Sequence, residues 1–309
     1  MANINNRLEY INELAEIDPQ LLIERSETRY KNIISDISKK VSEDVGREII
    51  MLAGPSASGK TTTANKLAKS FTELGMKTYV VSLDDFYLDR DDLPFDEEGQ
   101  HDYETVFALD LPLIAKTLNS LLRGEATRLP VFDFKCGKRS DEFNEITLDK
   151  NDAIIVEGLH ALNPIITEDL PNDRLLKIYI SVSSRIYDEN GKIILNKRNI
   201  RFIRRMVRDY KFRASSVQNT YELWDGVRSG EDKYLFPYKK NADMTINSIH
   251  LSEPCVFNDI AIKMLSEADL KPDRAADAQK LLFSLRKIKS IPSTLVPKNS
   301  LLREFLGND

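Results

Sequence analysis

The sequence predicts an α/β protein built on a doubly wound, five-stranded parallel sheet. Five short runs of apolar and β-branched residues alternate with stretches of helical periodicity, at 47–53, 77–83, 153–157, 175–181 and 243–247. Parallel strands joined by right-handed helical crossovers produce this alternation. The first run also leads directly into a glycine-bounded loop and then a helical pattern, which is typical of a nucleotide-binding sheet.

The first 46 residues predict a helical extension before the sheet. Asp18-Pro19 indicates an N-cap with proline at the first position of a second helix. Apolar residues precede it at helical spacing, and others define the buried face of the helix after it. The first set is Ile4, Leu8, Ile11, Leu14 and Ile17, and the second is Tyr30, Ile33, Ile37 and Val41.

The segment from Gly54 to Thr62, GPSASGKTT, fits the phosphate-binding pattern G-x-x-x-x-G-K-[ST]. Glycines at both ends let backbone N–H groups turn inward, and the N-terminus of the following helix favours an anion. Lys60 is expected to reach the outer phosphates, Thr61 to offer its hydroxyl to Mg²⁺, and Thr62 to assist at the α-phosphate. The pattern therefore predicts a P-loop NTPase-type fold with an ATP site formed by Gly54, Ser56, Ala57, Ser58, Gly59, Lys60, Thr61 and Thr62.

Acidic residues follow two of the predicted strands. Asp84 and Asp85 come after the run 77–83, and Glu157 ends the run 153–157. Ligands of parallel sheets bind at the carboxyl ends of the strands. We expect Asp84 to accept the proton of an acceptor hydroxyl, Asp85 to be a solvent or helix-cap residue, and Glu157 to hold Mg²⁺ directly or through water. The alternatives are an ordinary turn for the aspartates and a helix cap for Glu157.

An inserted ribbon interrupts the alternation of strands and helices. Residues 127–134 and 145–148 flank a polar connection and predict two antiparallel strands within about 126–149. Insertions of this kind often hold substrate. We therefore expect the ribbon to contribute to the acceptor site.

A run of arginines predicts a lid over about 197–230. Helical spacing puts Arg201, Arg205 and Arg208 on one face. A movable helix of this kind could close over the nucleotide and neutralise charge during transfer. The alternative is a solvated face. A second face of the same helix is formed by Ile203, Val207 and Tyr210. On a solvated face, the arginines could pair with Asp209, Glu222 or Asp225.

Composition excludes several classes of protein. The chain of 309 residues has 41% hydrophobic residues, a net charge of −5 and an isoelectric point near 5.5, which argue for a globular protein and against nucleic acid as the main partner. The two cysteines and three histidines show no metal-ligand spacing. With no secretory leader and no long apolar stretch, we expect a cytoplasmic protein that does not enter a membrane. The subunit count stays open, a homo-oligomer included.

Other nucleotide-binding classes fit less well. Asn196-Lys197-Arg198-Asn199 lacks the aspartate of a guanine-reading N-K-x-D sequence. The strand that ends in Glu157 lacks the Asp-Glu pair of a mechanical ATPase. Both observations favour transfer of the phosphate to a small molecule.

Several motifs together resemble the uridine kinase and phosphoribulokinase family. They are GPSASGKTT, SLDDFY, PVFDF, IIVEGLHALNP and RRMVRDYKFR, in this order. FDFKCGKR, WDGVRSGEDKYLFPY, ADMTINS and PKNSLLREFLG are similar to the family's bacterial nucleoside kinase branch, so the resemblance covers about residues 47–309. That branch often has an N-terminal threonyl-tRNA-synthetase-like segment, and we expect it to be absent, since only a short helical stretch precedes Arg47.

The resemblance implies an ATP- and Mg²⁺-dependent kinase of the 5′-hydroxyl of a ribonucleoside, uridine or cytidine by default. It implies that Asp84 is the catalytic base with Tyr87 nearby, and that Thr61 and Glu157 serve Mg²⁺. It further implies that Asp102 and Arg205 hold the ribose hydroxyls, and that Arg208 and Arg213 face the phosphates, with Lys60 and Arg208 acting in catalysis. The implied parts are a helical extension (1–46), a kinase core (47–250) and a C-terminal helical segment packed on the core (251–309).

Some positions depart from the family pattern. Phe132 stands where uridine kinases usually have tyrosine, and Cys136-Gly137-Lys138 where a histidine follows the ribbon strand. Arg213-Ala214-Ser215 replaces Arg-Gly-Arg. Phe132 and Phe134 then offer a stacking surface to the acceptor. A kinase of another small alcohol, such as a sugar phosphate or pantothenate, and a nucleotide-binding regulator without turnover stay as alternatives.

Overall fold

The computed structural model describes residues 6–43, 48–96, 98–134 and 136–307. The predicted helix position Ile4 and the first residue of the predicted strand 47–53 lie outside these residues. The predicted boundary between residues 46 and 47 lies outside them as well.

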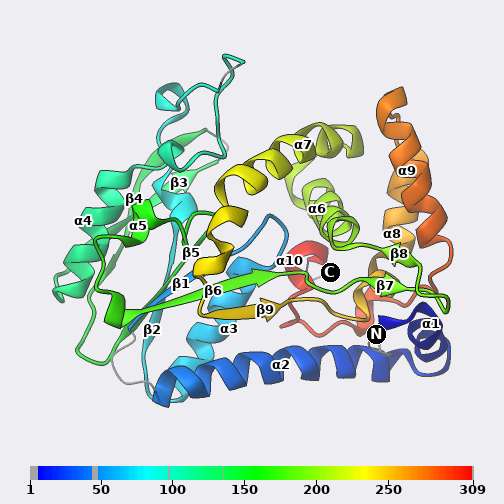
Figure 1. Cartoon of the computed structure of the whole chain (residues 1–309), viewed down its shortest axis with the longest axis horizontal. Helices are drawn as coiled ribbons and strands as arrows, with labels where there is room; N and C mark the ends of the chain where they lie inside the picture. Colours follow the sequence, from blue (N-terminus) through cyan, green and yellow to red (C-terminus); the bar gives the residue numbers. More distant parts are fainter. Residues whose placement is uncertain (1–5, 44–47, 97, 135, 308–309) are drawn as a thin grey trace.

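The central sheet has five parallel strands in the order β2-β5-β1-β6-β9 (Figure 1). All five predicted strands form. Four of them have both bounds within one residue of the prediction, and the first, whose predicted start lies outside the described residues, ends at Ala53 as predicted. The strands are β1 (Ile49–Ala53), β2 (Thr78–Ser82), β5 (Ala153–Gly158), β6 (Leu175–Ser181) and β9 (Met244–Asn247). Every residue of β1 and β5 is buried, as expected for strands covered on both faces.

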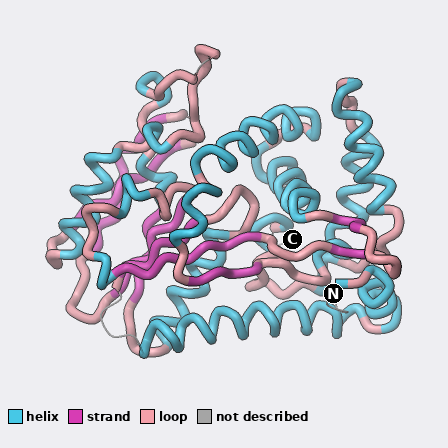
Figure 2. The backbone as a smooth tube through the Cα atoms, in the orientation of Figure 1, coloured by secondary structure: helices cyan, strands magenta, loops and turns pink. Residues whose placement is uncertain are grey.

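Helices cover both faces of the sheet (Figure 2). Alternate residues of β1 enter different cores: Ile50 and Leu52 pack in the larger one, and Ile49 and Met51 in the smaller one. The larger core is formed with α1 (Leu8–Ile17), α2 (Pro19–Glu43), α3 (Lys60–Glu73), α6 (Lys197–Arg213), α7 (Val217–Tyr234), α8 (Glu253–Glu267), α9 (Pro272–Leu285) and α10 (Arg303–Leu306). The smaller core is formed with α4 (Leu111–Leu122) and α5 (Pro164–Thr167).

The N-terminal helices follow the sequence signals. Asp18 caps α2, since its Oδ1 accepts a hydrogen bond from the backbone N–H of Leu21 at 2.9 Å, and Pro19 opens the helix. Tyr30, Ile37 and Val41 are buried. The extended α2 packs against α3, the helix that follows the phosphate loop (Figure 1).

The ribbon forms, but its second strand lies earlier than predicted. β3 (Thr127–Asp133) pairs antiparallel with β4 (Lys138–Ile146), with an irregularity between Pro130 and Phe132. The expectation of a strand at 145–148 was therefore wrong in its bounds. Most residues of β4 are exposed, so the strand lacks the apolar alternation that marks a half-buried strand.

Short elements complete the fold. The strands β7 (Ile186–Tyr187) and β8 (Ile193–Leu195) pair as a hairpin. The 3₁₀ helices are η2 (Leu83–Phe86), η3 (Arg90–Asp92), η4 (Val106–Ala108), η5 (Asn172–Arg174), η6 (Phe236–Asn241) and η7 (Ser293–Leu295). In the part of the chain that the structure describes, none of the helices has the length and apolarity needed to cross a membrane.

Candidate active site

The phosphate loop connects the central strand β1 to α3, and close contacts require glycine at both of its ends. A Cβ on Gly54 would lie 2.3 Å from the carbonyl oxygen of Ile180. Gly59 has a φ of +88°, and a Cβ there would lie 2.6 Å from the side chain of Leu301. The loop therefore depends on these glycines both for its turn and for its packing.

A threonine and a carboxylate meet where the loop enters α3. Thr61 donates from Oγ1 to Oε1 of Glu157 at 2.9 Å, and Ser82 donates to the same oxygen at 3.2 Å. Glu157 is 3% exposed. Hydroxyl and carboxylate oxygens are the ligand types that suit Mg²⁺, which needs only one or two protein ligands beside the substrate phosphates. Thr61 and Glu157 therefore fit the predicted metal role, although no group of three or more acidic, histidine or cysteine ligands occurs among the described residues.

Neighbouring ionisable side chains shift the pKa values of Glu157 and Glu104. The pKa of Glu157 is raised to about 7, first by burial and then by the nearby charge of Asp84, while Lys60 opposes the shift. Burial likewise raises the pKa of Glu104 to about 7. The charges of Glu231 and Asp84 add to this rise, and those of Arg205 and Lys60 oppose it. The structure thus brings Asp84, Lys60 and Glu157 into one site. Glu104 is an additional acidic group there that the sequence analysis did not identify.

Asp84 and Asp85 have different environments. The chain leaves β2 at Ser82 and enters η2, where Asp84 is exposed. Asp85 instead accepts from the backbone N–H of Phe132 at 3.2 Å, and burial raises its pKa. The expectation that Asp85 is a solvent or helix-cap residue was wrong, because the 3₁₀ turn directs it toward β3. Asp85 ties the ribbon to the end of β2.

Three aromatic rings gather between η2 and the ribbon. The ring centroids of Tyr87 and Phe132 are 5.8 Å apart, those of Phe132 and Phe134 5.0 Å, and those of Tyr87 and Phe134 6.3 Å. Phe134 is 62% exposed. We call Tyr87, Phe132 and Phe134 the aromatic cluster. It offers an apolar surface on the ribbon side of the site.

Asp102 is engaged by its own loop and by α7. Its Oδ1 accepts from the backbone N–H groups of Glu104 and Thr105 at 3.0 and 3.1 Å. Its Oδ2 accepts from the hydroxyl of Tyr234 at 2.9 Å. Among the contacts of the described residues, Arg205 does not pair with Asp102; it donates to Ser56 Oγ at 2.9 Å and pairs with Asp209 at 3.1 Å.

The arginines of α6 that were predicted to act in the lid contact the phosphate loop or Asp209. Arg201 donates to the carbonyl oxygen of Ser56 at 2.8 Å and pairs with the buried Glu231. Arg208 and Arg213 lie 3.4 and 3.3 Å from Asp209. Of the acidic partners considered from the sequence, Glu222 and Asp225 pair instead with Lys271 and Arg274.

The apolar side of α6 packs firmly. Ile203 and Val207 are buried, as predicted, but Tyr210 is 57% exposed. Its assignment to the same apolar face was wrong, since the last turn of α6 extends past the larger core. The predicted movement of this helix as a lid stays a prediction, and the structure holds its first turns in the larger core.

Sequence reasoning missed Glu231 and Arg204. Glu231 accepts from the backbone N–H of Ser56 at 2.8 Å and is 1% exposed. The signal lies in the spacing of α7, since Trp224 and Val227 precede Glu231 at helical intervals on the buried face. Arg204 likewise lies on the buried face of α6 with Ile203 and Val207. A charged residue on the apolar face of a helix predicts that its side chain is buried and pairs with another polar group.

The central strand β1 leads into a phosphate loop, Glu157 lies near the end of the neighbouring strand β5, and Asp84 follows β2 on the far side of β5. This arrangement is typical of a phosphate-loop phosphotransferase. The comparisons with known proteins agree. The family model of the phosphoribulokinase / uridine kinase family matches residues 49–253, and the chain belongs to this family.

Individual relatives support the same assignment. The chain is 33% identical to the uridine kinase of Staphylococcus aureus (strain JH9) over 201 residues, which cover 64% of this chain and 86% of that protein. Among solved structures, a putative fructose transport system kinase from Silicibacter sp. TM1040 superimposes with a TM-score of 0.52 at 19% identity, covering 69% of this chain and 98% of the other. At that identity, the second likeness concerns the fold alone.

Proposed function

We propose that this kinase transfers the γ-phosphoryl group of ATP to the 5′-hydroxyl of a ribonucleoside, uridine or cytidine by default, and releases ADP and the nucleoside 5′-monophosphate. One observation supports this most strongly. Asp84, Lys60 and Glu157 interact electrostatically at the edge of the sheet where the aromatic cluster begins. In this proposal Asp84 would be the proton acceptor, with Lys60 on the phosphate side and the aromatic cluster as the surface for a planar base.

On the donor side, the loop from Gly54 to Thr62 would hold the phosphates through backbone N–H groups, and Lys60 would reach the transferred group. Thr61 and Glu157 would hold Mg²⁺, which when bound neutralises charge on the phosphates. Arg208 and Arg213 would face the phosphates. Their shared partner Asp209 holds both guanidinium groups near the end of α6.

On the acceptor side, Asp84 would orient the hydroxyl and accept its proton, and the aromatic cluster would stack on the base. Asp102 would hold the ribose 2′- and 3′-hydroxyls with Arg205. A carboxylate has about four lone-pair sites, and three are used by the described donors, so Oδ2 has capacity for a hydroxyl beside Tyr234. Ribose binding then requires Arg205 to turn from Asp209 toward Asp102.

A kinase of another small alcohol is the second candidate. The rings of Phe132 and Phe134 carry no polar atom that could distinguish one base from another. A phosphotransferase site of this kind therefore accommodates an acceptor other than a nucleoside with less change than a site that hydrogen-bonds a base. A regulator without turnover is disfavoured by the intact combination of Lys60, Asp84 and Glu157.

The division of the chain is also a proposal. We infer that the kinase core (47–250), with its ribbon (126–149) and lid (197–230), carries the helices of 1–46 and 251–309 as extensions rather than as separate domains. Residues of α1, α2, α8, α9 and α10 share one continuous core with the sheet, which supports this view.

An ADP-release screen tests the proposed function. The panel contains uridine, cytidine, adenosine, guanosine, a hexose, pantothenate and ribulose 5-phosphate, each with MgATP. The proposal expects the fastest ADP release with a pyrimidine ribonucleoside. Faster release with a sugar, a sugar phosphate or pantothenate would favour the second candidate, and release that no acceptor accelerates would favour a regulator.

A further inference from the structure

Arg204 lies fully buried behind the phosphate loop, with 0% exposure. Its Nε and Nη2 donate to the two carboxylate oxygens of Glu253 at 2.5 and 2.9 Å. Nη2 also donates to the carbonyl oxygen of Ser248 at 2.9 Å. Nη1 points to the phosphate loop, with the carbonyl oxygens of Ala57 and Ser58 at 3.3 and 3.4 Å. Nη1 also lies 3.4 Å from Ser248 Oγ. Glu253 thus balances the charge of Arg204, while Nη1 contacts both the loop and Ser248.

The loop segment that Arg204 contacts has an unusual backbone. Ala57 has a φ of +57°, and Ala57 and Ala214 are the two non-glycine residues with positive φ among those described. This left-handed conformation is unfavourable for a residue with a Cβ atom. Such conformations persist where neighbouring groups hold them in place. The hydrogen bond from Arg204 to the carbonyl group of Ala57 is one such restraint.

The second contact has a consequence for the opposite side of the loop. In a trans peptide the C=O and N–H groups point in opposite directions. When Arg204 draws the carbonyl oxygen of Ser58 toward itself, the N–H of Gly59 in the same peptide turns away from Arg204. An N–H group of this loop that points inward is what an anionic phosphate requires.

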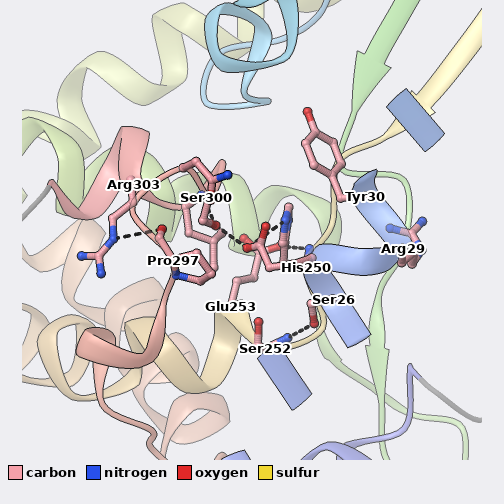
Figure 3. Close-up of polar contacts among 12 residues, drawn as sticks. Ser26, Arg29, Tyr30, His250, Ser252, Glu253, Pro297, Ser300 and Arg303 are labelled. Carbon is pink, nitrogen blue, oxygen red and sulfur yellow. Dashed lines mark hydrogen bonds and ion pairs between the residues drawn. The ribbon is translucent and has the colours of Figure 1, made fainter. Parts of the chain in front are cut away.

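Glu253, the ion-pair partner of Arg204, belongs to a polar network that joins distant parts of the chain; Figure 3 shows Glu253 with His250, Ser252 and Ser26. Glu253 Oε1 also accepts from the backbone N–H of His250 at 2.9 Å. His250 packs on the ring of Tyr30, with 5.1 Å between ring centroids. Ser252, one residue before Glu253, donates from its backbone to Ser26 Oγ at 3.1 Å. The N-terminus of α8 is thereby fixed on α2, and Glu253 with it.

We propose that Arg204 is a positioning residue of the phosphate loop: it holds Ala57 in the left-handed conformation and directs the Gly59 amide toward the donor phosphates. Arg204 acts through the backbone and does not touch the donor. The role rests on the proposed function only in that the loop binds MgATP. It is independent of which alcohol accepts the phosphate.

A double-mutant cycle tests the role, with the Kd of MgATP measured by calorimetry on the full chain without acceptor. Arg204→Lys should weaken MgATP binding about tenfold while the KM of the acceptor changes little. Ala57→Gly removes the need for Arg204 to hold a strained backbone at residue 57, because glycine adopts a positive φ at little cost. When Arg204→Lys is combined with Ala57→Gly, it should therefore weaken binding by clearly less than it does alone.

The control is Arg29→Lys. Arg29 on α2 also bridges backbone carbonyl oxygens, those of Asn247 and Ile249, and it has no hydrogen bond to the loop among the described residues. It should show no coupling to Ala57→Gly. If Arg204→Lys does not fold, Glu253→Asp takes its place in the cycle, since a shorter carboxylate draws Arg204 away from the loop with both charges kept.

The outcomes separate the two proposals. Unmodified protein that binds MgATP, with additive effects of the two substitutions, overturns the positioning role alone. Arg204→Lys could instead lower the thermal stability and weaken the binding of MgATP and of the acceptor alike, with no recovery in combination with Ala57→Gly. This result would show that Arg204 has a purely structural part, and it overturns the role as well. Unmodified protein that does not bind MgATP overturns both this role and the proposed function.

Discussion

Asp84 is the side chain on which the proposed transfer depends most directly. It is exposed at the end of β2, next to the buried Glu157, whose pKa its charge helps to raise. Asp84→Asn keeps the shape of the side chain and removes the proton acceptor. We expect kcat to fall by roughly 10²–10⁴ with little change in the Kd of MgATP. Steady-state kinetics and calorimetry measure the two quantities.

Asp85→Asn is the matched control for this experiment. Asp85 accepts from the ribbon backbone at Phe132, so its substitution should act mainly on the KM of the acceptor. An unchanged kcat in Asp84→Asn, together with a large loss in Asp85→Asn, would assign the base to Asp85.

Asp102 determines the expected selectivity for the sugar. A site that hydrogen-bonds a substrate hydroxyl discriminates against an analogue that lacks it, because a buried polar group is then left unpaired. We expect ribonucleosides to be better substrates than 2′-deoxynucleosides, and Asp102→Ala to remove most of kcat/KM for ribonucleosides and to narrow this gap. Competition kinetics with uridine and 2′-deoxyuridine measure it.

Tyr234→Phe separates the contributions around Asp102. It removes the hydroxyl that donates to Oδ2 and leaves the carboxylate in place. Discrimination between the two sugars should persist in this variant. Equal use of both sugars by the unmodified enzyme would rule out the ribose role of Asp102.

At the scale of elements, α10 places a carboxylate against the start of α3. Thr62 donates to Glu304 Oε2 from its hydroxyl at 2.6 Å and from its backbone N–H at 3.4 Å. Thr62 is the residue predicted to assist at the α-phosphate. We expect Glu304→Gln to tighten MgATP binding roughly threefold to tenfold, because it removes a like charge from the phosphate position.

Glu267→Gln, an exposed substitution at the end of α8, is the control for Glu304→Gln and should leave the Kd unchanged. Calorimetric titration with MgATP gives both values. Weaker binding in Glu304→Gln would show that Glu304 supports the loop as a cap of α3 and does not compete with the donor.

The junction of α2 and α8 predicts a dependence of stability on pH. Burial lowers the pKa of His250 to about 3, and Arg204, Arg29 and Lys66 add to the shift. Glu27, whose own pKa is raised by burial, lies 3.6 Å from His250 Nε2. The folded protein keeps His250 neutral, whereas the unfolded chain takes up a proton below about pH 6.5. Stability should therefore fall as the pH drops from about 6.5 toward 3, by up to about 1.4 kcal/mol per pH unit from this group.

Urea denaturation at several pH values measures this slope. His250→Gln should flatten the dependence between pH 6.5 and 4, and His101→Gln, on a partly exposed loop, should retain the slope of the unmodified protein. A slope that His250→Gln leaves unchanged would assign the dependence to other groups.

The ribbon shows what periodicity can and cannot predict for an element. β3 has buried residues at Thr127, Leu129 and Pro130, and its run was recognised. β4 is mostly exposed and is specified by its pairing with β3, which a single sequence does not display. The candidate positions Lys60, Asp84 and Glu157 could be selected from the sequence, because each lies in or shortly after a predicted strand and the chemistry of phosphate transfer requires those residue types. Their catalytic roles stay predictions.

On the scale of the whole molecule, the contacts that complete the site join distant parts of the chain. Thr62 and Glu304 are 242 residues apart, and Ser300 and Glu27, which hydrogen-bond each other, are 273 apart. The five strands could be predicted because each is a local apolar run. These pairings could not, since nothing local distinguishes Glu304 or Glu27 from a solvated acid. The positions of α2 and α10 around the phosphate loop emerge only from the folded chain.

The proposed function requires that the phosphoryl group of ATP passes to the 5′-hydroxyl of a nucleoside. Mass spectrometry of the products formed from MgATP with uridine, and with 5′-deoxyuridine as the matched acceptor that lacks only this hydroxyl, tests it most directly. Uridine should give uridine 5′-monophosphate and an equal amount of ADP, and 5′-deoxyuridine should give neither above background. Equal ADP formation with both acceptors, or phosphorylation of uridine at another hydroxyl, would contradict it.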